Sequence, residues 1–326
     1  MRKNLNESRL RSILRDAARS ALKENRRRRM FEDADPSKID SDKFPNKLSA
    51  VDRSTAKQLA SGGLEDNDKK DDIAGAEKVS LAAAALKASQ TTMDFGKFVG
   101  MAIQMMGKLG SFSSGAGGDL GAIISSDNHI MDGHHRWAAT LMVDPKANVG
   151  GLKVQLPGEK LVGVLNVWTV AHGGAGKPSD TDLASLTSDS VAEKFKEMAS
   201  KGGKFLPSPE EMLSAFKKSG FDSLDAAAAH VKKNWDATSK ARAVLGWMPA
   251  KVDMPAIEPD QLPQVASDIA SGKMDINPPY AADTKGQAKA SSSEKGSEAS
   301  VQKSGFDRGG AVMVERWQRL AGIIKG

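Results

Sequence analysis

One stretch decides the fold of this chain: Ser125-Ser126-Asp127-Asn128-His129-Ile130-Met131-Asp132-Gly133-His134-His135-Arg136-Trp137-Ala138-Ala139. The apolar pair Ile123-Ile124 before it is typical of a strand end, and Asp127-Asn128 supplies turn residues. Asp132-Gly133 then breaks the return strand, and the residues that follow are compatible with a helix. The stretch therefore predicts a β-hairpin that runs directly into a helix.

The junction between this hairpin and this helix is a candidate anion site. Backbone N–H groups and the positive end of the helix dipole gather at a helix N-terminus. Gly133 lets the backbone approach an anion closely, and Arg136 offers a forked guanidinium. His134 and His135 can donate to phosphate oxygens or exchange protons near neutral pH. Asp132 could hold Mg²⁺ against phosphates or orient a histidine.

Two other interpretations of this junction stay open. Its side chains could simply cap and brace a strand-to-helix turn. Alternatively, His129, His134 and His135 could bind a metal, with His172 as the only further candidate ligand. Adjacent histidines rarely point the same way, and the crowding of five such residues in one turn favours phosphate binding. The glycine-rich segment 172–177 lacks the spacing of a phosphate loop, and no serine-hydrolase elbow is present.

The composition limits the class of protein. The 326 residues are 39% hydrophobic and only 5% aromatic, which predicts a core of roughly 200 residues with poorly packed flanks. The absence of cysteine excludes disulfides and thiol chemistry. The net charge of +6, partly from Arg26–Arg29, suits either a polyanionic partner or a solvated basic tail.

The N-terminal sequence and the hydropathy predict where the protein resides. Charges recur throughout residues 1–29, so we expect no export by a signal peptide. No apolar run reaches the roughly 18 residues that a membrane helix requires, so we expect no membrane partner. We therefore expect a soluble protein that is not exported by that route.

The pattern along the chain predicts a folded body with a tethered helix at each end. Within the body, helical patterns cover residues 80–88, 95–106 and 159–170, and residues 152–156 alternate as a strand. The predicted segments are a basic amphipathic helix at 1–29, a disordered linker at 30–75, an α/β domain at 76–178, a helical region at 179–280, a flexible linker at 281–305 and an amphipathic helix at 306–326.

Part of the body resembles the ParB/sulfiredoxin-like superfamily, most closely the N-terminal domain of ParB-type proteins and their phage-encoded relatives. The matching residues are Leu86-Lys87-Ala88-Ser89-Gln90 and Ile130 to Ala139, within about residues 76–172. The resemblance implies a small α/β (α+β) domain with a mixed sheet, in which a Gly-x-x-Arg turn cradles nucleotide phosphates. The implied phosphate contacts are Gly133, His134, His135 and Arg136, with Gln90 in an upstream segment that faces the ligand.

The superfamily includes CTP-hydrolysing DNA partition clamps, a free-serine kinase, the sulfinic-acid reductase sulfiredoxin and some nucleases. Sulfiredoxin chemistry needs a cysteine in this turn, so the chain cannot perform it. No clear helix-turn-helix follows the domain, which counts against specific DNA partitioning. The terminal helices also resemble short end-peptides in proteins of large tailed bacteriophages. These resemblances imply the cytoplasm of a bacterial host or a phage virion as the location.

Three functions follow as expectations. The first is binding of a nucleoside triphosphate, CTP or ATP with Mg²⁺, followed by hydrolysis or phosphoryl transfer; Asp132, His134 and His135 are the candidate catalytic residues, and Asp132 the candidate Mg²⁺ ligand. The second is a catalytically silent scaffold, docked in a phage capsid or another assembly through the terminal helices. The third is nonspecific binding of DNA through the basic N-terminal helix.

Overall fold

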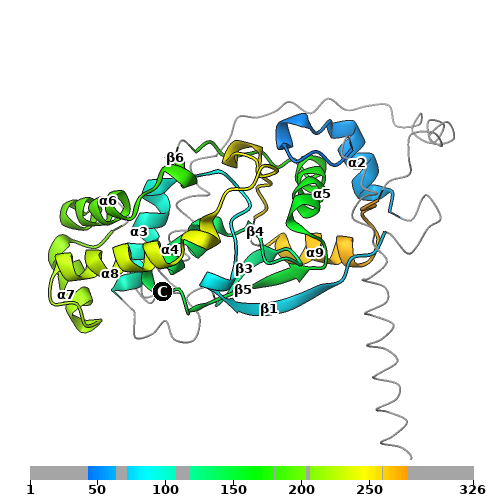
Figure 1. Cartoon of the computed structure of the whole chain (residues 1–326). Helices are drawn as coiled ribbons and strands as arrows, with labels where there is room; N and C mark the ends of the chain where they lie inside the picture. The colour runs from blue at the N-terminus through cyan, green and yellow to red at the C-terminus, as the bar shows by residue number, and fades with distance from the viewer. Residues whose placement is uncertain are drawn as a thin grey trace, which may run out of the picture.

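The computed structural model describes residues 43–63, 72–107, 118–179, 181–202, 206–258 and 260–277 (Figure 1). This part of the chain has a mixed α/β fold, as the sequence predicts. A four-stranded sheet contains β1 (Ala76–Ala82), β3 (Gly118–Ile124), β4 (Ile130–Asp132) and β5 (Asn148–Val154), in the order β1-β5-β3-β4. β5 runs parallel to β3 and antiparallel to β1, and β3 pairs with β4 in a hairpin.

A smaller sheet joins two distant segments. β2 (Thr92–Met93) pairs antiparallel with β6 (Thr181–Asp182). β2 directly precedes α3 (Phe95–Met106), whereas β6 introduces the helical region. The pairing therefore attaches that region to the segment that leads into α3.

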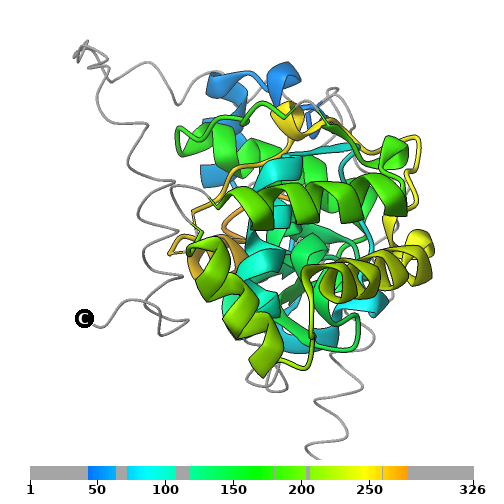
Figure 2. The same ribbon diagram turned by 90° about the vertical axis from the view of Figure 1, so that its left-hand side faces the viewer.

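The strands of the main sheet separate two hydrophobic cores, because successive side chains of a strand point to opposite faces. Ile124 and Ile130 belong to the first core, whereas Ile123 and Met131 belong to the second. The first core contains residues from α3, α4 (His134–Val143), α6 (Ser188–Lys201), α7 (Pro209–Lys218) and α8 (Leu224–Ala237). The second contains residues from α2 (Arg53–Ser61), α5 (Gly158–Ala171) and α9 (Leu262–Ala270). In Figure 2, α6, α7 and α8 lie toward the viewer, in front of α3 and α4.

The central helix α4 follows directly from the hairpin, which confirms the predicted local structure. Asn128 adopts a left-handed conformation in the turn, with φ of 68°. Gly133 then adopts φ of 99° and forms the N-cap of α4, a conformation that glycine accepts without the steric cost of a Cβ atom. Every residue of α4 is buried. The predicted turn is therefore held deep in the body.

The segment 43–63 corrects the prediction of a disordered linker over residues 30–75. It contains a short 3-10 helix, η2 (Leu48–Ala50), and then α2, whose N-terminus is capped by the Asp52 side chain. Phe44 is buried in the second core, and α2 packs against α5. The polar composition suggested disorder, but a helix cap and a few apolar anchors are sufficient to fix this segment.

The segment 80–88 also differs from its prediction. Its alanine-rich sequence suggested a helix, but residues up to Ala82 belong to β1 and a 3-10 turn, η3 (Ala83–Ala85), follows. β1 pairs along its whole length with β5. This long-range pairing overrides the local preference of alanine for helix, since tertiary pairing outweighs intrinsic propensity. The helices predicted at 95–106 and 159–170 are confirmed as α3 and α5, and most of residues 181–277 are helical.

Several predicted features lie outside the described residues. They are the basic helix at 1–29 with Arg26–Arg29, the linker at 281–305 and the C-terminal helix at 306–326. DNA binding and docking in a phage assembly, which depend on these segments, stay predictions. In the part of the chain that the structure describes, no helix combines the length and apolar character needed to cross a membrane.

Candidate functional site

A pocket lies at the N-terminus of α4. All six residues that the sequence predicts for phosphate contact or catalysis line it: Gln90, Asp132, Gly133, His134, His135 and Arg136. Its volume of about 80 Å³ exceeds the roughly 10–15 Å³ that one water molecule requires. It is well below the roughly 300–1,000 Å³ of sites that enclose whole drug-sized ligands. The pocket therefore has room for a small charged group such as a phosphoryl group, rather than for a complete nucleotide.

Four further charged residues line the pocket, and the sequence analysis missed them. Lys97 comes from α3, Lys251 begins the 3-10 turn η7 (Lys251–Asp253), and Lys177 and Glu258 come from loops. Lys177 and Glu258 pair at 3.6 Å between Nζ and Oε1. Lys97 is the only charged residue of α3, which is a signal that could have identified it. Lys177 ends the glycine-rich segment 172–177, which lacks the spacing of a phosphate loop, and no comparable local pattern marks Lys251 or Glu258.

Lys97 and Lys251 are the unpaired cations of this pocket. Both side chains are partly buried, and neither ammonium group forms an ion pair with another residue that the structure describes. Burial, followed by the positive charge of Lys177, lowers the pKa of Lys97. Burial is also the main cause that lowers the pKa of Lys251. A partly buried cation without a counterion is costly, so the pocket favours an anionic ligand.

The hydrogen bonds of Gln90 fix the orientation of its amide. The residue is fully buried, and its Nε2 donates to the backbone oxygen of Thr92 at 2.7 Å. A carbonyl oxygen can only accept, so the amide nitrogen must face Thr92. The Oε1 atom of Gln90 is buried and has no hydrogen-bond partner among the described residues.

His134 is held in place by Ser89. The Ser89 hydroxyl donates to the backbone oxygen of Ile130 at 2.7 Å, and its Oγ lies 3.0 Å from Nε2 of His134. Since the hydroxyl proton is used on Ile130, the Nε2–H of His134 donates to Ser89. Burial, and then the positive charge of Lys251, hold the pKa of His134 well below its usual range. His134 is therefore neutral near pH 7.

His135 has the opposite tautomer. The backbone N–H of Asp94 donates to its Nε2 at 3.3 Å, so the ring proton is on Nδ1. Burial, and then the positive charge of Lys97, hold the pKa of His135 well below its usual range. His135 can therefore donate to an anion through its Nδ1–H, whereas the only N–H of neutral His134 is used on Ser89. Neither histidine contributes a full positive charge near neutral pH.

Asp132 is one of the two carboxylates that line the pocket, the other being Glu258. It is partly buried at the end of β4. Burial raises its pKa to about 6, against the opposing effect of Arg136, Lys251 and Lys177. Arg136 is itself buried, and burial lowers its pKa. Asp132 is thus a group that can accept a proton in the range where phosphate esters also titrate.

The raised pKa of Asp132 predicts a pH-dependent effect on stability. The pKa moves from the ordinary 3.8 to about 6 on folding, so the folded state favours the protonated form. This stabilising contribution is complete below the unfolded pKa and is lost as the pH rises through the folded pKa. We expect Asp132→Asn, which stays neutral, to exceed the wild type in free energy of unfolding by an amount that grows between these two pKa values and is constant above them. Urea denaturation across this range measures the difference, and a difference independent of pH would contradict the prediction.

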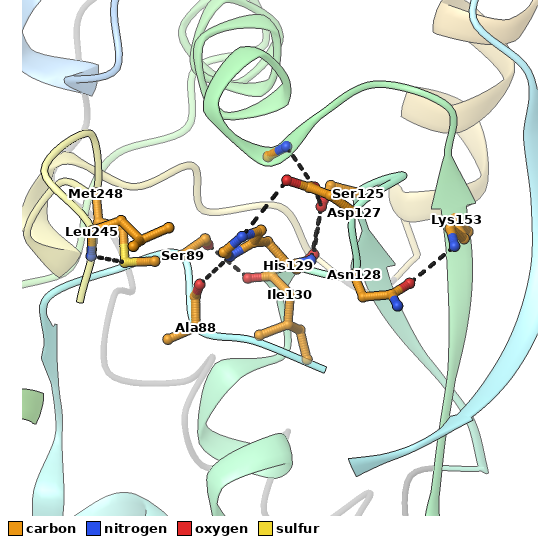
Figure 3. A network of polar contacts seen from close by, with 11 residues as sticks. Ala88, Ser89, Ser125, Asp127, Asn128, His129, Ile130, Lys153, Leu245 and Met248 are labelled. Atoms are coloured by element: carbon orange, nitrogen blue, oxygen red, sulfur yellow. Dashed lines mark hydrogen bonds and ion pairs between the residues drawn. The ribbon is translucent and has the colours of Figure 1, made fainter. Parts of the chain in front are cut away.

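His129 lies in a separate polar network, which Figure 3 shows. Its Nδ1 forms a hydrogen bond with the backbone oxygen of Ala88, and its Nε2 lies 3.7 Å from Oδ2 of Asp127. Oδ1 of Asp127 accepts from the backbone N–H of Gly158 at 2.9 Å, at the start of α5. This network attaches the hairpin turn to α5. His129 thus has a structural role.

His129, His134 and His135 do not form the alternative metal site. His129 is bonded to a backbone oxygen, whereas His134 is bonded to Ser89. His172 lies at the end of α5, where its ring stacks on Trp168 at 3.9 Å between centroids. Across the described ranges, no group of three or more histidine, cysteine, aspartate or glutamate residues is placed to hold a metal ion.

Comparisons with protein-family models, with curated proteins and with solved structures find no match for this chain. The resemblance to the ParB/sulfiredoxin-like superfamily therefore stays a prediction from the motif.

Proposed function

We propose that the pocket binds the terminal phosphate of a nucleoside triphosphate, CTP or ATP. One observation carries the proposal: Lys97 and Lys251 line the pocket and form no ion pair with a described residue. Arg136 lines the same pocket at the N-terminus of α4. An anionic ligand would supply the direct ion pair that neither ammonium group forms with a described residue, although the Asp132 carboxylate acts on both lysines at longer range. The pocket volume fits the phosphate end of the ligand, so the nucleoside would lie outside it.

The proposed contacts divide between the backbone and the side chains. Gly133 brings the backbone close to the phosphate, and the N-terminus of α4 adds its partial positive charge. Arg136 neutralises phosphate charge through its guanidinium. The Nδ1–H of His135 is a neutral donor, whereas Nε2 of His134 is already used by Ser89.

Hydrolysis of the bound triphosphate is the catalytic extension of this proposal. A water molecule would attack the terminal phosphorus, and the bond to the bridging oxygen of the diphosphate would break. Asp132, as the general base, would take the proton of the water, since its carboxylate is ionised above a pKa of about 6. Lys97 and Lys251 would stabilise the charge of the transferring group.

Mg²⁺ stays part of the proposal as an ion that accompanies the ligand. The pocket has two carboxylates, Asp132 and Glu258, and Glu258 is paired with Lys177. Mg²⁺ often binds through one or two carboxylates together with substrate phosphates. The positive charges of Arg136, Lys251 and Lys177 act on Asp132 and would repel a free Mg²⁺ ion. Mg²⁺ is therefore expected to enter the pocket bound to the phosphates. Asp132 would be its protein ligand as an alternative to the role of general base, because a carboxylate bound to the ion is held ionised.

A titration of the full chain with CTP, ATP and ADP, with and without Mg²⁺, tests the proposal. We expect Lys97→Met and Lys251→Met each to weaken binding about tenfold or more, because each removes a charge-assisted contact. The matched control is Lys201→Met, which removes an exposed lysine paired with Glu197 on α6. Release of inorganic phosphate from the bound triphosphate reports hydrolysis.

The outcomes of this titration are distinct. Weakened binding by the two pocket variants, with unchanged binding by Lys201→Met, supports the proposal. Binding that is absent in the wild type, or that all three variants reduce equally, refutes it. Equal reduction would indicate a general effect of net charge instead of a specific site.

A further inference from the structure

We propose that this pocket selects oxyanions that carry a proton, inorganic phosphate and phosphate monoesters, over oxyanions without one, such as sulfate. The inference rests on the proposed function, since it concerns the ligand of the same pocket. Two acceptor groups carry it, the Asp132 carboxylate and the amide oxygen of Gln90. Both residues line the pocket among its cations.

The Oε1 atom of Gln90 is a hydrogen-bond acceptor that no described residue uses. Its amide nitrogen is committed to the backbone oxygen of Thr92, so rotation of the amide would place two oxygens against each other. Oε1 therefore remains an acceptor, and it is buried without a partner among the described residues. A buried polar atom without a hydrogen bond is destabilising. A ligand that donates a hydrogen bond on this side of the pocket would remove that cost, whereas a ligand that only accepts would not.

Asp132 adds a second acceptor, and this one is a negatively charged carboxylate. The charged groups that act on it are Arg136 from α4, Lys251 from η7, and Lys177 and Glu258 from loops, while Lys97 of α3 lines the same pocket. The cations attract any oxyanion, but a carboxylate repels one. A proton shared between the carboxylate and the oxyanion converts this repulsion into a hydrogen bond.

The chemistry of the two oxyanions then determines the preference. Near neutral pH every inorganic phosphate ion carries at least one P–OH group that can donate, and a phosphate monoester, whose second pKa is roughly 6, carries one in part of its molecules. Sulfate has the same shape and a similar size but carries no proton in this pH range. The lysines and Arg136 therefore provide attraction for both anions, and the two acceptors distinguish them.

Isothermal titration calorimetry with sodium phosphate and with sodium sulfate, at one ionic strength and near pH 7.5, where Asp132 is ionised, measures the preference on the full chain. We expect the wild type to bind phosphate at least about tenfold more tightly than sulfate. Gln90→Met keeps the approximate side-chain volume and removes the acceptor, so it should weaken phosphate binding and leave sulfate binding unchanged. Asp132→Asn removes the negative charge, so it should tighten sulfate binding and reduce the ratio.

The experiment separates this inference from the proposed function. Equal binding of phosphate and sulfate by the wild type overturns the inference, although the pocket would remain an anion site. Absence of binding by phosphate, sulfate and nucleotide overturns both. A preference that persists unchanged in Gln90→Met and in Asp132→Asn overturns the assignment of the two acceptors. Circular dichroism of each variant establishes that it is folded, and the two variants are independent tests.

Discussion

Replacing Trp137 by alanine is expected to lower the free energy of unfolding by about 3–5 kcal/mol, the range for loss of a large aromatic side chain from a core. Trp137 lies on α4 and is fully buried in the first core. Its indole Nε1 also donates to the backbone oxygen of Ala83 at 2.9 Å. The substitution therefore leaves a cavity and removes one of the two hydrogen bonds that the Ala83 carbonyl accepts, the other coming from the backbone N–H of Leu86.

Urea denaturation followed by circular dichroism measures this loss. The matched control is Trp247→Ala, since Trp247 is only partly buried and its ring meets the edge of His129 at 5.1 Å between centroids. We expect a clearly smaller loss for the control. A loss below about 1 kcal/mol for Trp137→Ala, the size of a typical surface effect, would contradict the packing of α4 described above.

Replacing Gly163 by alanine is expected to detach the segment 43–63 from α5. A Cβ atom at Gly163 would lie 2.1 Å from the backbone oxygen of Phe44 and 2.8 Å from its carbonyl carbon. Backbone atoms cannot rotate away as a side chain can, so the clash requires the segment to move. Overpacking of a core typically costs about 1–3 kcal/mol and occasionally more.

Limited proteolysis and hydrogen exchange within residues 43–63 detect the detachment. Gly100→Ala is the matched control, because Gly100 is also inside a helix, α3, but its Cβ would meet only Cε of Met198, at 3.5 Å. An alanine there should be neutral or stabilise the helix by up to about 1 kcal/mol. Unchanged protection of the segment in Gly163→Ala would show that the contact with Phe44 does not hold it.

The sequence by itself determined the hairpin, the turn and the helix that follows. Turn residues at Asp127-Asn128 and a glycine at position 133 act locally, since each restricts the backbone of its own neighbours. The helical periodicity of α3 and α5 is local for the same reason. The sequence also determined that residues 132–136 lie close together, because they are consecutive along the chain and form the start of one helix.

Only the tertiary structure decided the remaining features. β1 is a strand because β5 pairs with it, although its alanines prefer a helix. The segment 43–63 is ordered because α5 and Phe44 meet at a glycine. The cations that turn the helix start into an anion pocket, Lys97, Lys177 and Lys251, come from three separate segments. Convergence of distant residues depends on how helices and sheet pack, and no local pattern in the sequence records it.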